Sequence, residues 1–168
     1  MTATTETRDE EQAYASEEED RPLAGYLLLL ASYLGFTIAI GTWLRRRGPL
    51  PRHIPPGDVL LLGIATHKIS RTLTKEPIAS PLRAPFTAYE GVSGPAELKE
   101  RVRGHGVRHA VGEMLTCPFC LGQWTATTLL TGFVVAPRAT RLVASLFAAT
   151  TISDSLQLVY ARLQGASR

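Results

Sequence analysis

Cysteine is scarce in this sequence, because the 168 residues contain only Cys117 and Cys120. Two cysteines cannot form the disulfide framework that holds many small secreted domains together. Their meaning must therefore be local, and three interpretations are open. They form a redox pair, supply half of a metal site, or pack as small residues in the interior.

Two common sequence signals are also missing. The segment before the first apolar run is acidic rather than basic, and no small-residue cleavage site follows that run, so we expect no cleaved signal peptide. Gly104 and Gly106 lack both a third glycine and a preceding strand, which argues against a glycine-rich phosphate loop.

Charge is distributed unevenly along the chain. Residues 1–20 contain eight of the fifteen acidic residues and one cation, Arg8, so the overall charge of +3 combines an acidic arm with a strongly basic remainder. We expect residues 1–21 to be disordered, because they cannot bury enough apolar surface to offset the entropy of ordering. The basic remainder suits anionic lipid better than nucleic acid, since apolar runs separate its basic clusters and aromatic residues do not interleave with them.

Three long apolar runs occupy much of the rest. Leu23–Leu44 and Met114–Val135 each contain 22 residues without a charge, and Leu142–Tyr160 is interrupted only by Asp154. About 20 apolar residues are enough for a helix to cross the hydrocarbon core of a bilayer. We therefore predict an all-α membrane protein with three transmembrane helices. These are residues 22–44, 114–136 and 141–160.

The segments between these runs are basic and rich in proline. Residues 45–57 form a connector, and Asp58 is then placed to cap a helix over residues 58–73 that begins apolar and becomes basic. We expect this helix to be interfacial or partly inserted. Residues 74–113 follow as an irregular polar region, because prolines recur there every four residues, with one short helix over Pro95–Val102.

Lysine and arginine suggest an orientation in the membrane. They are concentrated in residues 45–113, and cytoplasmic loops of membrane proteins carry an excess of both residues. With three transmembrane helices, this bias predicts that the amino terminus is outside and that residues 45–113 are cytoplasmic. The prediction requires that the helix over residues 58–73 does not cross the membrane.

The sequence Cys117-Pro-Phe-Cys120 lies at the expected start of a helix. Cysteines three residues apart share one face there, and the positive end of a helix activates the leading thiol in C-x-x-C redox motifs. A membrane thiol-disulfide oxidoreductase would use Cys117 as the nucleophile and Cys120 as the resolving thiol. Such enzymes generally pass electrons to a second cysteine pair, which this chain lacks, so a structural role is favoured.

A zinc site is a weaker hypothesis. His105 and His109 precede the cysteines by a short spacer, and two imidazoles with the thiolates of Cys117 and Cys120 could complete a tetrahedral shell. A single C-x-x-C without a second pair is a weak zinc signal. We therefore predict no metal and no other cofactor.

Asp154 is a carboxylate within an expected transmembrane helix, where a charge is costly and needs a partner. The candidate partners are His67, Lys68 and Arg71, all on the basic half of the helix over residues 58–73. We favour a contact that holds the helices together over a proton or ion path, because one carboxylate makes a poor relay.

Several segments resemble a known family. They are Arg71–Ile78, Pro81–Thr87, Gly112–Trp124, Ser153-Asp154 and Tyr160. Together they resemble the bacterial domain of unknown function 1360, which includes sporulation-associated YjcA-like small membrane proteins. The likeness covers residues 58–160, so the arm and the first helix are additions and residues 161–168 a tail. The family motif comprises Arg83, Pro85, Phe86, Thr116, Pro118, Phe119 and Trp124.

The resemblance implies a small multi-pass protein of the bacterial cell membrane without an established activity or cofactor. We accordingly predict a non-enzymatic structural or interaction protein. Its expected partners are a bilayer with anionic headgroups and another protein or a second copy of the chain, and no nucleic acid is expected. The alternative from a different class is the thiol-disulfide oxidoreductase built on Cys117 and Cys120.

Overall fold

The structure, a computed structural model, describes residues 21–166. The disordered arm expected over residues 1–21 lies outside the described residues except for Arg21, and residues 167–168 lie outside them too. The described part is mostly helical, with six α-helices, one 3-10 helix and one two-stranded sheet. The elements are α2 (Leu23–Arg47), α3 (Pro56–Lys75), η1 (Pro77–Ala79), α4 (Ser80–Arg83), β1 (Thr87–Gly94), β2 (Glu97–Val102), α5 (Val107–Thr116), α6 (Pro118–Val135) and α7 (Pro137–Ala166).

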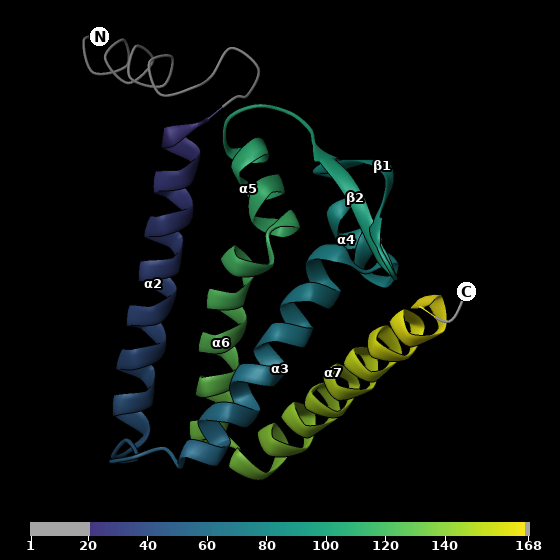
Figure 1. The fold of residues 1–168 in the computed structure, drawn as a ribbon. Helices are drawn as coiled ribbons and strands as arrows, with labels where there is room; N and C mark the ends of the chain where they lie inside the picture. Colours follow the sequence, from purple (N-terminus) through teal and green to yellow (C-terminus); the bar gives the residue numbers. More distant parts are fainter. Residues whose placement is uncertain (1–20, 167–168) are drawn as a thin grey trace, which may run out of the picture.

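The long helices run alternately down and up (Figure 1). α2 descends, α3 ascends, the successive helices α5 and α6 descend, and α7 ascends at a slant. The bundle therefore has two distinct ends. The hairpin end contains the start of α2, the short helix α4, the strands β1 and β2, and α5. The arginine end contains Arg45–Arg47, residues 48–55 and the junction of α6 and α7.

Two ion pairs fix these ends through side-chain contacts. Arg21 Nη1 lies 3.0 Å from Glu113 Oε1, which joins the start of α2 to the end of α5. Arg141 Nε lies 2.7 Å from Asp58 Oδ1, which joins the start of α7 to the start of α3. α3 and α7 therefore both begin at the arginine end.

The apolar core lies where α3, α6 and α7 meet. Leu62 and Ala65 of α3, Leu129 and Phe133 of α6, and Ala144 of α7 are buried against one another. Within α3 and within α6 these residues lie three or four positions apart, the spacing that places side chains on one face of a helix. α3 is thus the central helix of the core.

The short interfacial helix expected over residues 58–73 is longer and more central than predicted. α3 has 20 residues and begins at Pro56, where the missing N–H of a proline has no helical partner to lose. Asp58 is not the helix cap; its carboxylate accepts hydrogen bonds from Arg141 at 2.7 and 2.8 Å.

The position of α3 changes the expected arrangement of the polar segments. Residues 45–57 and residues 74–113 were predicted to lie together on one side, but α3 carries the chain from the arginine end to the hairpin end between them. The structure thus places these two polar segments at opposite ends of the bundle. The prediction counted the cations of α3 against a crossing without taking account of their acidic partners Glu76, Glu97 and Asp154.

The region over residues 74–113 is regular, which corrects the irregular region predicted from its prolines. Pro77 begins η1 and Pro81 lies in the first turn of α4. A proline in the first turn of a helix costs no hydrogen bond, so these prolines start short helices rather than prevent them.

A β-hairpin occupies much of this region, and it was not predicted. The segment Pro95–Val102, expected as a short helix, forms part of the turn and the strand β2. β2 pairs antiparallel with β1 from Thr87↔Val102 to Gly94↔Glu97, with two irregularities in register. Tyr89 and Val92 of β1 are aromatic and β-branched residues, which favour a strand.

The helix expected over residues 114–136 is divided. α5 ends at Thr116, Cys117 has extended backbone angles (φ −104°, ψ 108°), and α6 begins at Pro118. A proline disfavours helical angles at the residue before it, which explains the break. α5 consequently packs at the hairpin end, while α6 continues through the bundle.

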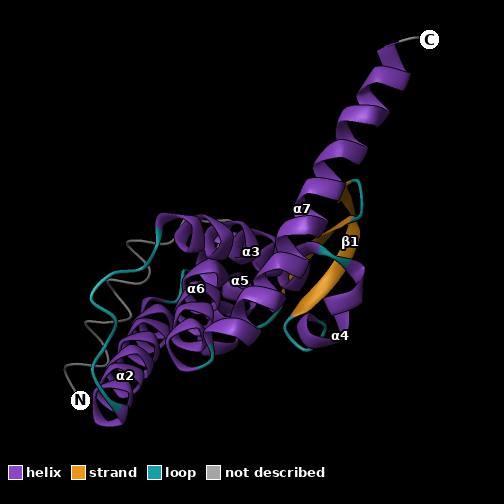
Figure 2. Cartoon of the chain, turned by 90° about the horizontal axis from the view of Figure 1, so that it is seen from below, coloured by secondary structure: helices purple, strands orange, loops and turns teal. Residues whose placement is uncertain are grey.

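α7 is longer than the helix predicted over residues 141–160. It runs from Pro137 to Ala166, so the described part of residues 161–168 continues the helix and forms no separate tail. Its second half projects away from the other helices (Figure 2).

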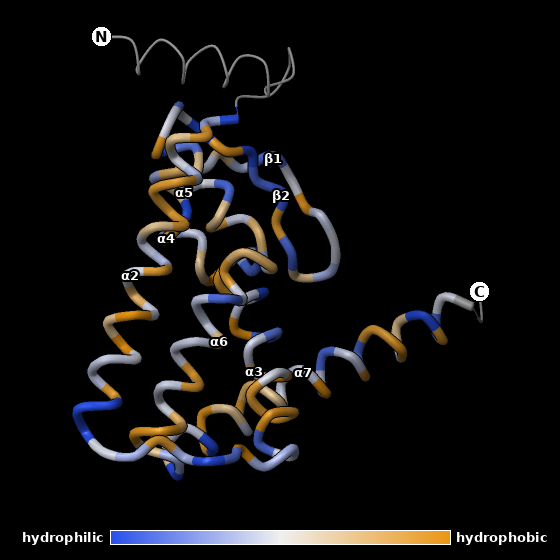
Figure 3. The backbone as a smooth tube through the Cα atoms, turned by 90° about the vertical axis from the view of Figure 1, so that its left-hand side faces the viewer, coloured by the Kyte–Doolittle hydropathy of each residue, from blue (hydrophilic) through white to orange (hydrophobic). Residues whose placement is uncertain are grey.

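Two helices, Leu23–Arg47 and Pro137–Gly165, are long and apolar enough to cross a membrane. Figure 3 shows hydrophilic positions at the arginine end and in the hairpin, and mainly hydrophobic or neutral positions along the helices between them. The three predicted transmembrane helices are therefore not confirmed, because α6, at 18 residues, is not among the helices that pass this test.

Gly112→Ala should weaken the packing of α5 on the hairpin. A Cβ at this position would lie 2.6 Å from Val102 Cγ1 and 3.1 Å from the carbonyl oxygen of Phe86. We expect a loss of roughly 1–3 kcal/mol in the free energy of unfolding, the usual effect of overpacking, measured by denaturant titration in detergent micelles. Gly63→Ala is the control, because nothing lies within 4 Å of a Cβ there. Equal losses in both variants would contradict the prediction.

Candidate functional site

Arg83 is a fully buried cation at the hairpin end. Its Nε and Nη2 atoms bind the carboxylate of Glu100 on β2 at 2.5 and 3.3 Å. Its Nη1 atom donates to the carbonyl oxygens of Leu73 and Glu76 at 2.9 and 3.1 Å. Carbonyl groups at the end of a helix lack internal donors. Arg83 therefore caps α3 and binds the hairpin at the same time.

Two further arginines hold the backbone that follows α4. Arg103 Nη2 donates to the carbonyl of Ala84 at 2.5 Å, and its backbone N–H donates to the carbonyl of Phe86 at 2.8 Å. Arg108 Nη2 donates to the carbonyl of Pro85 at 2.5 Å. The predicted motif residues Pro85 and Phe86 thus lie where α4, the hairpin and α5 are joined.

Cys117 and Cys120 are free thiols, the first half-buried and the second exposed. The sulfur of Cys117 accepts a hydrogen bond from the backbone N–H of Cys120 at 3.2 Å, and Pro118 occupies the first position of α6. A side chain that accepts from an N–H of the first turn is a helix cap. The arrangement of the pair therefore serves the start of α6.

The other predicted motif residues near the cysteines have different surroundings. Thr116 donates back to the carbonyl of Gly112 at 3.0 Å. Trp124 packs against Tyr33 and Phe36 of α2, with ring centroids 5.2 and 5.4 Å apart. Phe119 is 90% exposed and makes little contact with the rest of the described chain.

The structure does not assemble the zinc site considered from the sequence. His109 contacts the carbonyl of Gly104 at 3.2 Å through Nδ1 and lies 3.7 Å from Glu113 through Nε2. Among residues 21–166, no group of three or more histidine, cysteine, aspartate or glutamate side chains could hold a metal ion. His105 and His109 therefore do not form a four-ligand site with the two cysteines.

Asp154 contacts the basic half of α3. Its Oδ2 atom lies 2.7 Å from Lys68 Nζ, which also binds the carboxylate of Glu76. Of the other two candidate partners, Arg71 pairs with Glu97 of β2. The third candidate, His67, lines the cavity that contains these ion pairs. The contact between Asp154 and Lys68 joins the second half of α7 to α3.

A polar cavity of about 580 Å³ surrounds these ion pairs, between α3, the hairpin turn and α7. Sequence reasoning identified its cations but did not assign Glu76 or Glu97 to it. Glu97 reaches it only because Pro95 and Ala96 turn the chain into β2, and Ala96 has a positive φ of 60°. No local sequence signal places a glutamate on a strand opposite an arginine 26 residues away.

A family described as "Protein of unknown function (DUF1360)" matches residues 61–160. The chain belongs to this family. The resemblance identified from the sequence motifs is thereby confirmed. A similar DUF1360 relative is "Sporulation protein YjcA" of Bacillus subtilis (strain 168), which is 28% identical over 107 residues, covering 62% of this chain and 91% of the relative. No solved structure matches the chain.

The DUF1360 match extends from α3 to α7 and leaves α2 outside. The buried arginine, the divided α5 and α6, and the ion pairs of Lys68 therefore lie within the matched region, whereas α2 lies outside it. Neither the family's description nor the relative's name indicates an enzymatic or oxidoreductase role.

Arg83→Met should destabilise the DUF1360 core strongly. The change leaves the carboxylate of Glu100, itself only 6% exposed, buried without its partner, and breaking a buried pair costs about 3–5 kcal/mol. Chemical unfolding in detergent measures the loss. Arg101→Met is the control, because Arg101 is 68% exposed and an exposed pair contributes at most about 1 kcal/mol. Similar losses in both variants would show that the buried pair is not special.

Asp154→Asn should loosen the second half of α7. The amide removes the negative charge that binds Lys68, while Lys68 keeps Glu76 as a partner. We expect amide hydrogen exchange over residues 155–165 to rise several-fold, measured by mass spectrometry in micelles. Ser155→Ala is the control on the adjacent position. Unchanged exchange in Asp154→Asn would contradict a tethering role for this ion pair.

Proposed function

We propose that the chain is a non-enzymatic integral membrane protein with a structural or interaction role, with α2, α3, α6 and α7 in the bilayer. The observation that carries this proposal is exposed apolar helix surface. Only 6% of the most hydrophobic window of α2, and 11% of that of α7, is buried by the rest of the chain. A core helix of a soluble protein would be mostly buried, whereas lipid covers such surface at no cost.

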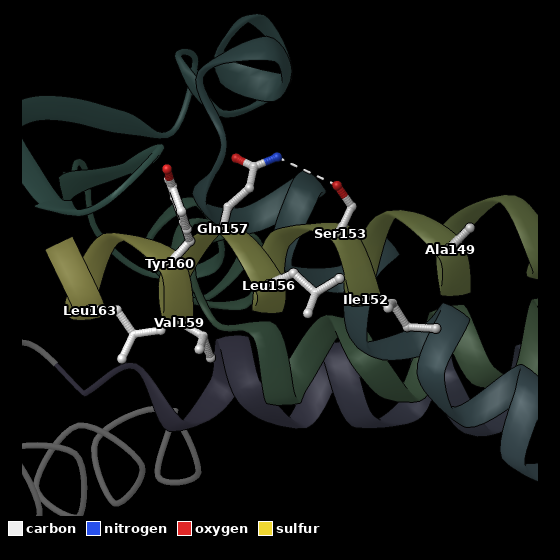
Figure 4. Close-up of a pocket in the computed structure, with 8 residues that line it drawn as sticks. All are labelled: Ala149, Ile152, Ser153, Leu156, Gln157, Val159, Tyr160 and Leu163. Carbon is white, nitrogen blue, oxygen red and sulfur yellow. Dashed lines mark hydrogen bonds between the residues drawn. The ribbon is translucent and has the colours of Figure 1, made fainter.

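One exposed face of α7 illustrates the argument (Figure 4). The side chains of Ile152, Leu156, Val159 and Leu163 lie along it, and each is between 54% and 65% exposed. They recur every three or four residues on the part of α7 that projects from the bundle. This continuous apolar face supports contact with hydrocarbon.

α3 needs a separate argument, because its cations would by themselves keep it out of a bilayer. Lys68 is paired with Glu76 and Asp154, and Arg71 with Glu97. Ionisable residues in membrane helices face the bundle interior and pair with one another. The pairing supports a fourth crossing by α3, in place of the three crossings expected from composition.

A fourth crossing also changes the orientation that we propose. More lysine and arginine residues lie at the hairpin end than at the arginine end. Under the positive-inside rule, the hairpin end therefore faces the cytoplasm. Outside the proposed crossing of α3, the described cations at the hairpin end are Arg21, Lys75, Arg83, Lys99, Arg101, Arg103, Arg108 and Arg162. At the arginine end they are Arg45, Arg46, Arg47, Arg52, Arg138 and Arg141.

Anionic headgroups are the first partner that we propose for the hairpin end. Lys99 and Arg101 are 67% and 68% exposed, and they share the single carboxylate of Glu90 at 3.7 and 3.0 Å. Two cations on one acid leave a positive excess, which attracts the negative surface of the cytoplasmic leaflet. The name of the Bacillus subtilis relative supports sporulation as the setting for this role.

The thiol-disulfide alternative is not carried forward. The chain has no second cysteine pair to pass electrons onward, and neither the family description nor the relative's name indicates a redox role. A structural role for Cys117 and Cys120 at the start of α6 requires no electron acceptor.

Single-cysteine labelling tests this topology. In a Cys117→Ser, Cys120→Ser background, Val92→Cys in the hairpin should react with a membrane-impermeant maleimide only in inverted vesicles, and His53→Cys only in intact cells. Both positions are exposed, so access depends on the side of the membrane alone. Resistance to carbonate extraction serves as the control for integral insertion. Labelling of both residues from one side would overturn the crossing by α3, and extraction by carbonate would overturn membrane insertion itself.

A further inference from the structure

A cavity of about 840 Å³ separates α2 from α5 and α6. α2 touches the rest of the chain closely at two levels. Near its start, Gly25 lies against α5, where an added Cβ would be 2.9 Å from the Cβ of Ala110. Farther along, the hydroxyls of Tyr33 and Thr127 lie 3.0 Å apart, and Tyr33 packs on Trp124. The cavity is thus held open between two fixed contacts.

One end of the cavity is polar and centres on Glu113. Its carboxylate lies 3.0 Å from Arg21 Nη1, accepts a hydrogen bond from the hydroxyl of Tyr26, and lies 3.7 Å from His109 Nε2. The side chains of Arg21 and Glu113 are 40% and 28% exposed, so the ion pair itself lies at the mouth of the cavity. This end offers one positive and one negative group side by side.

The remainder of the cavity is mainly apolar. Leu29, Leu30 and Tyr33 of α2 face Met114 and Trp124 across it. Leu30 is 55% exposed, so the cavity is open toward the surroundings of the bundle. A long apolar ligand could enter from the side without passing the charged end.

The depth of the two parts matches a bilayer. The uncharged run of α2 begins at Leu23, two residues after Arg21, which places the Arg21–Glu113 pair at the level of the headgroups. Leu30 lies seven residues farther on, roughly 10 Å deeper at 1.5 Å per residue. The cavity is therefore polar at headgroup depth and apolar at acyl-chain depth.

We propose that this cavity binds one zwitterionic phospholipid with a primary ammonium headgroup. The ammonium group donates to Glu113, the phosphate binds Arg21, and one acyl chain lies along Leu29, Leu30 and Trp124. The inference rests on the membrane location proposed above.

The charges at the mouth select among headgroups. A purely anionic headgroup would bring its charge against Glu113, whereas a zwitterion satisfies both Glu113 and Arg21. A primary ammonium carries three N–H donors for the carboxylate, and a quaternary ammonium carries none. Phosphatidylethanolamine therefore fits better than phosphatidylglycerol or phosphatidylcholine.

Competitive lipid retention tests the site. The full chain is reconstituted with equal parts of phosphatidylethanolamine, phosphatidylcholine and phosphatidylglycerol, re-extracted in mild detergent, and analysed for bound lipid by native mass spectrometry. We expect the wild type to retain phosphatidylethanolamine at least fivefold over each of the others. Retention of the three lipids in equal amounts would overturn the assignment of the headgroup.

Two variants separate the head from the tail of the ligand. Glu113→Gln keeps an oxygen that accepts from Tyr26 but removes the charge, so the preference for phosphatidylethanolamine should fall to near parity. Leu30→Trp fills the apolar part without touching the ion pair, so retention of every lipid should fall. Glu90→Gln is the matched control, because Glu90 pairs with Arg101 at 3.0 Å away from the cavity. Its preference for phosphatidylethanolamine over phosphatidylcholine, the other zwitterionic lipid, should stay as in the wild type.

The variants also decide whether the cavity is the site. Wild-type retention in Leu30→Trp, or an unchanged preference in Glu113→Gln, would overturn the proposal, and thermal melting of each variant in micelles shows that it is folded. A protein that resists carbonate extraction but shows no lipid preference loses only this site. A protein that carbonate removes from membranes loses the proposed function as well.

Discussion

The burial of Arg83 is the constraint on which the hairpin end depends. A guanidinium withdrawn from water must have all its charge and its donors matched, and Glu100 supplies the charge while the last carbonyls of α3 accept the remaining bonds. Arg83 and its partners come from three separate elements, so these contacts form only when α3, α4 and β2 have reached their final positions. Arg83 thereby joins the hairpin to the end of α3, and the pair of Arg71 with Glu97 is a second link between the same two elements.

The position of α2 depends in turn on the elements that are packed around Arg83. The arginines after α4 hold the backbone around Phe86, and the lack of a side chain at Gly112 lets α5 lie directly on that backbone. α5 in turn presents Ala110 to Gly25, and Glu113 to the start of α2. α2, which lies outside the region matched by the DUF1360 family, therefore packs on a surface formed by α5.

Amino-acid composition was sufficient to predict the exposed apolar helices. The remaining elements depend on contacts between residues distant in the sequence, which composition does not reveal. The apolar length of α2 and of α7 identified both helices, and the basic half of α3 supplied the partner of Asp154. The central place of α3 was missed because its cations are neutralised by Glu76, Glu97 and Asp154, two of which lie far along the chain. The hairpin was missed because Pro95–Val102 was expected to form a short helix, whereas Pro95 lies in the turn before β2. Pro77 and Pro81, which indicated irregular structure, begin short helices instead. The break at Cys117 was predictable from Pro118 alone.

The two ion pairs that fasten α7 to α3 are unequally spaced. Asp58 and Lys68 are ten residues apart on α3, whereas their partners Arg141 and Asp154 are thirteen apart on α7. At 1.5 Å per residue these intervals are about 15 Å and about 20 Å. α7 slants away from α3 as both rise (Figure 1), so the two salt bridges join the helices at unequal levels. The polar cavity lies between these two helices and the hairpin turn, and the contact of Lys68 with Asp154 lines it.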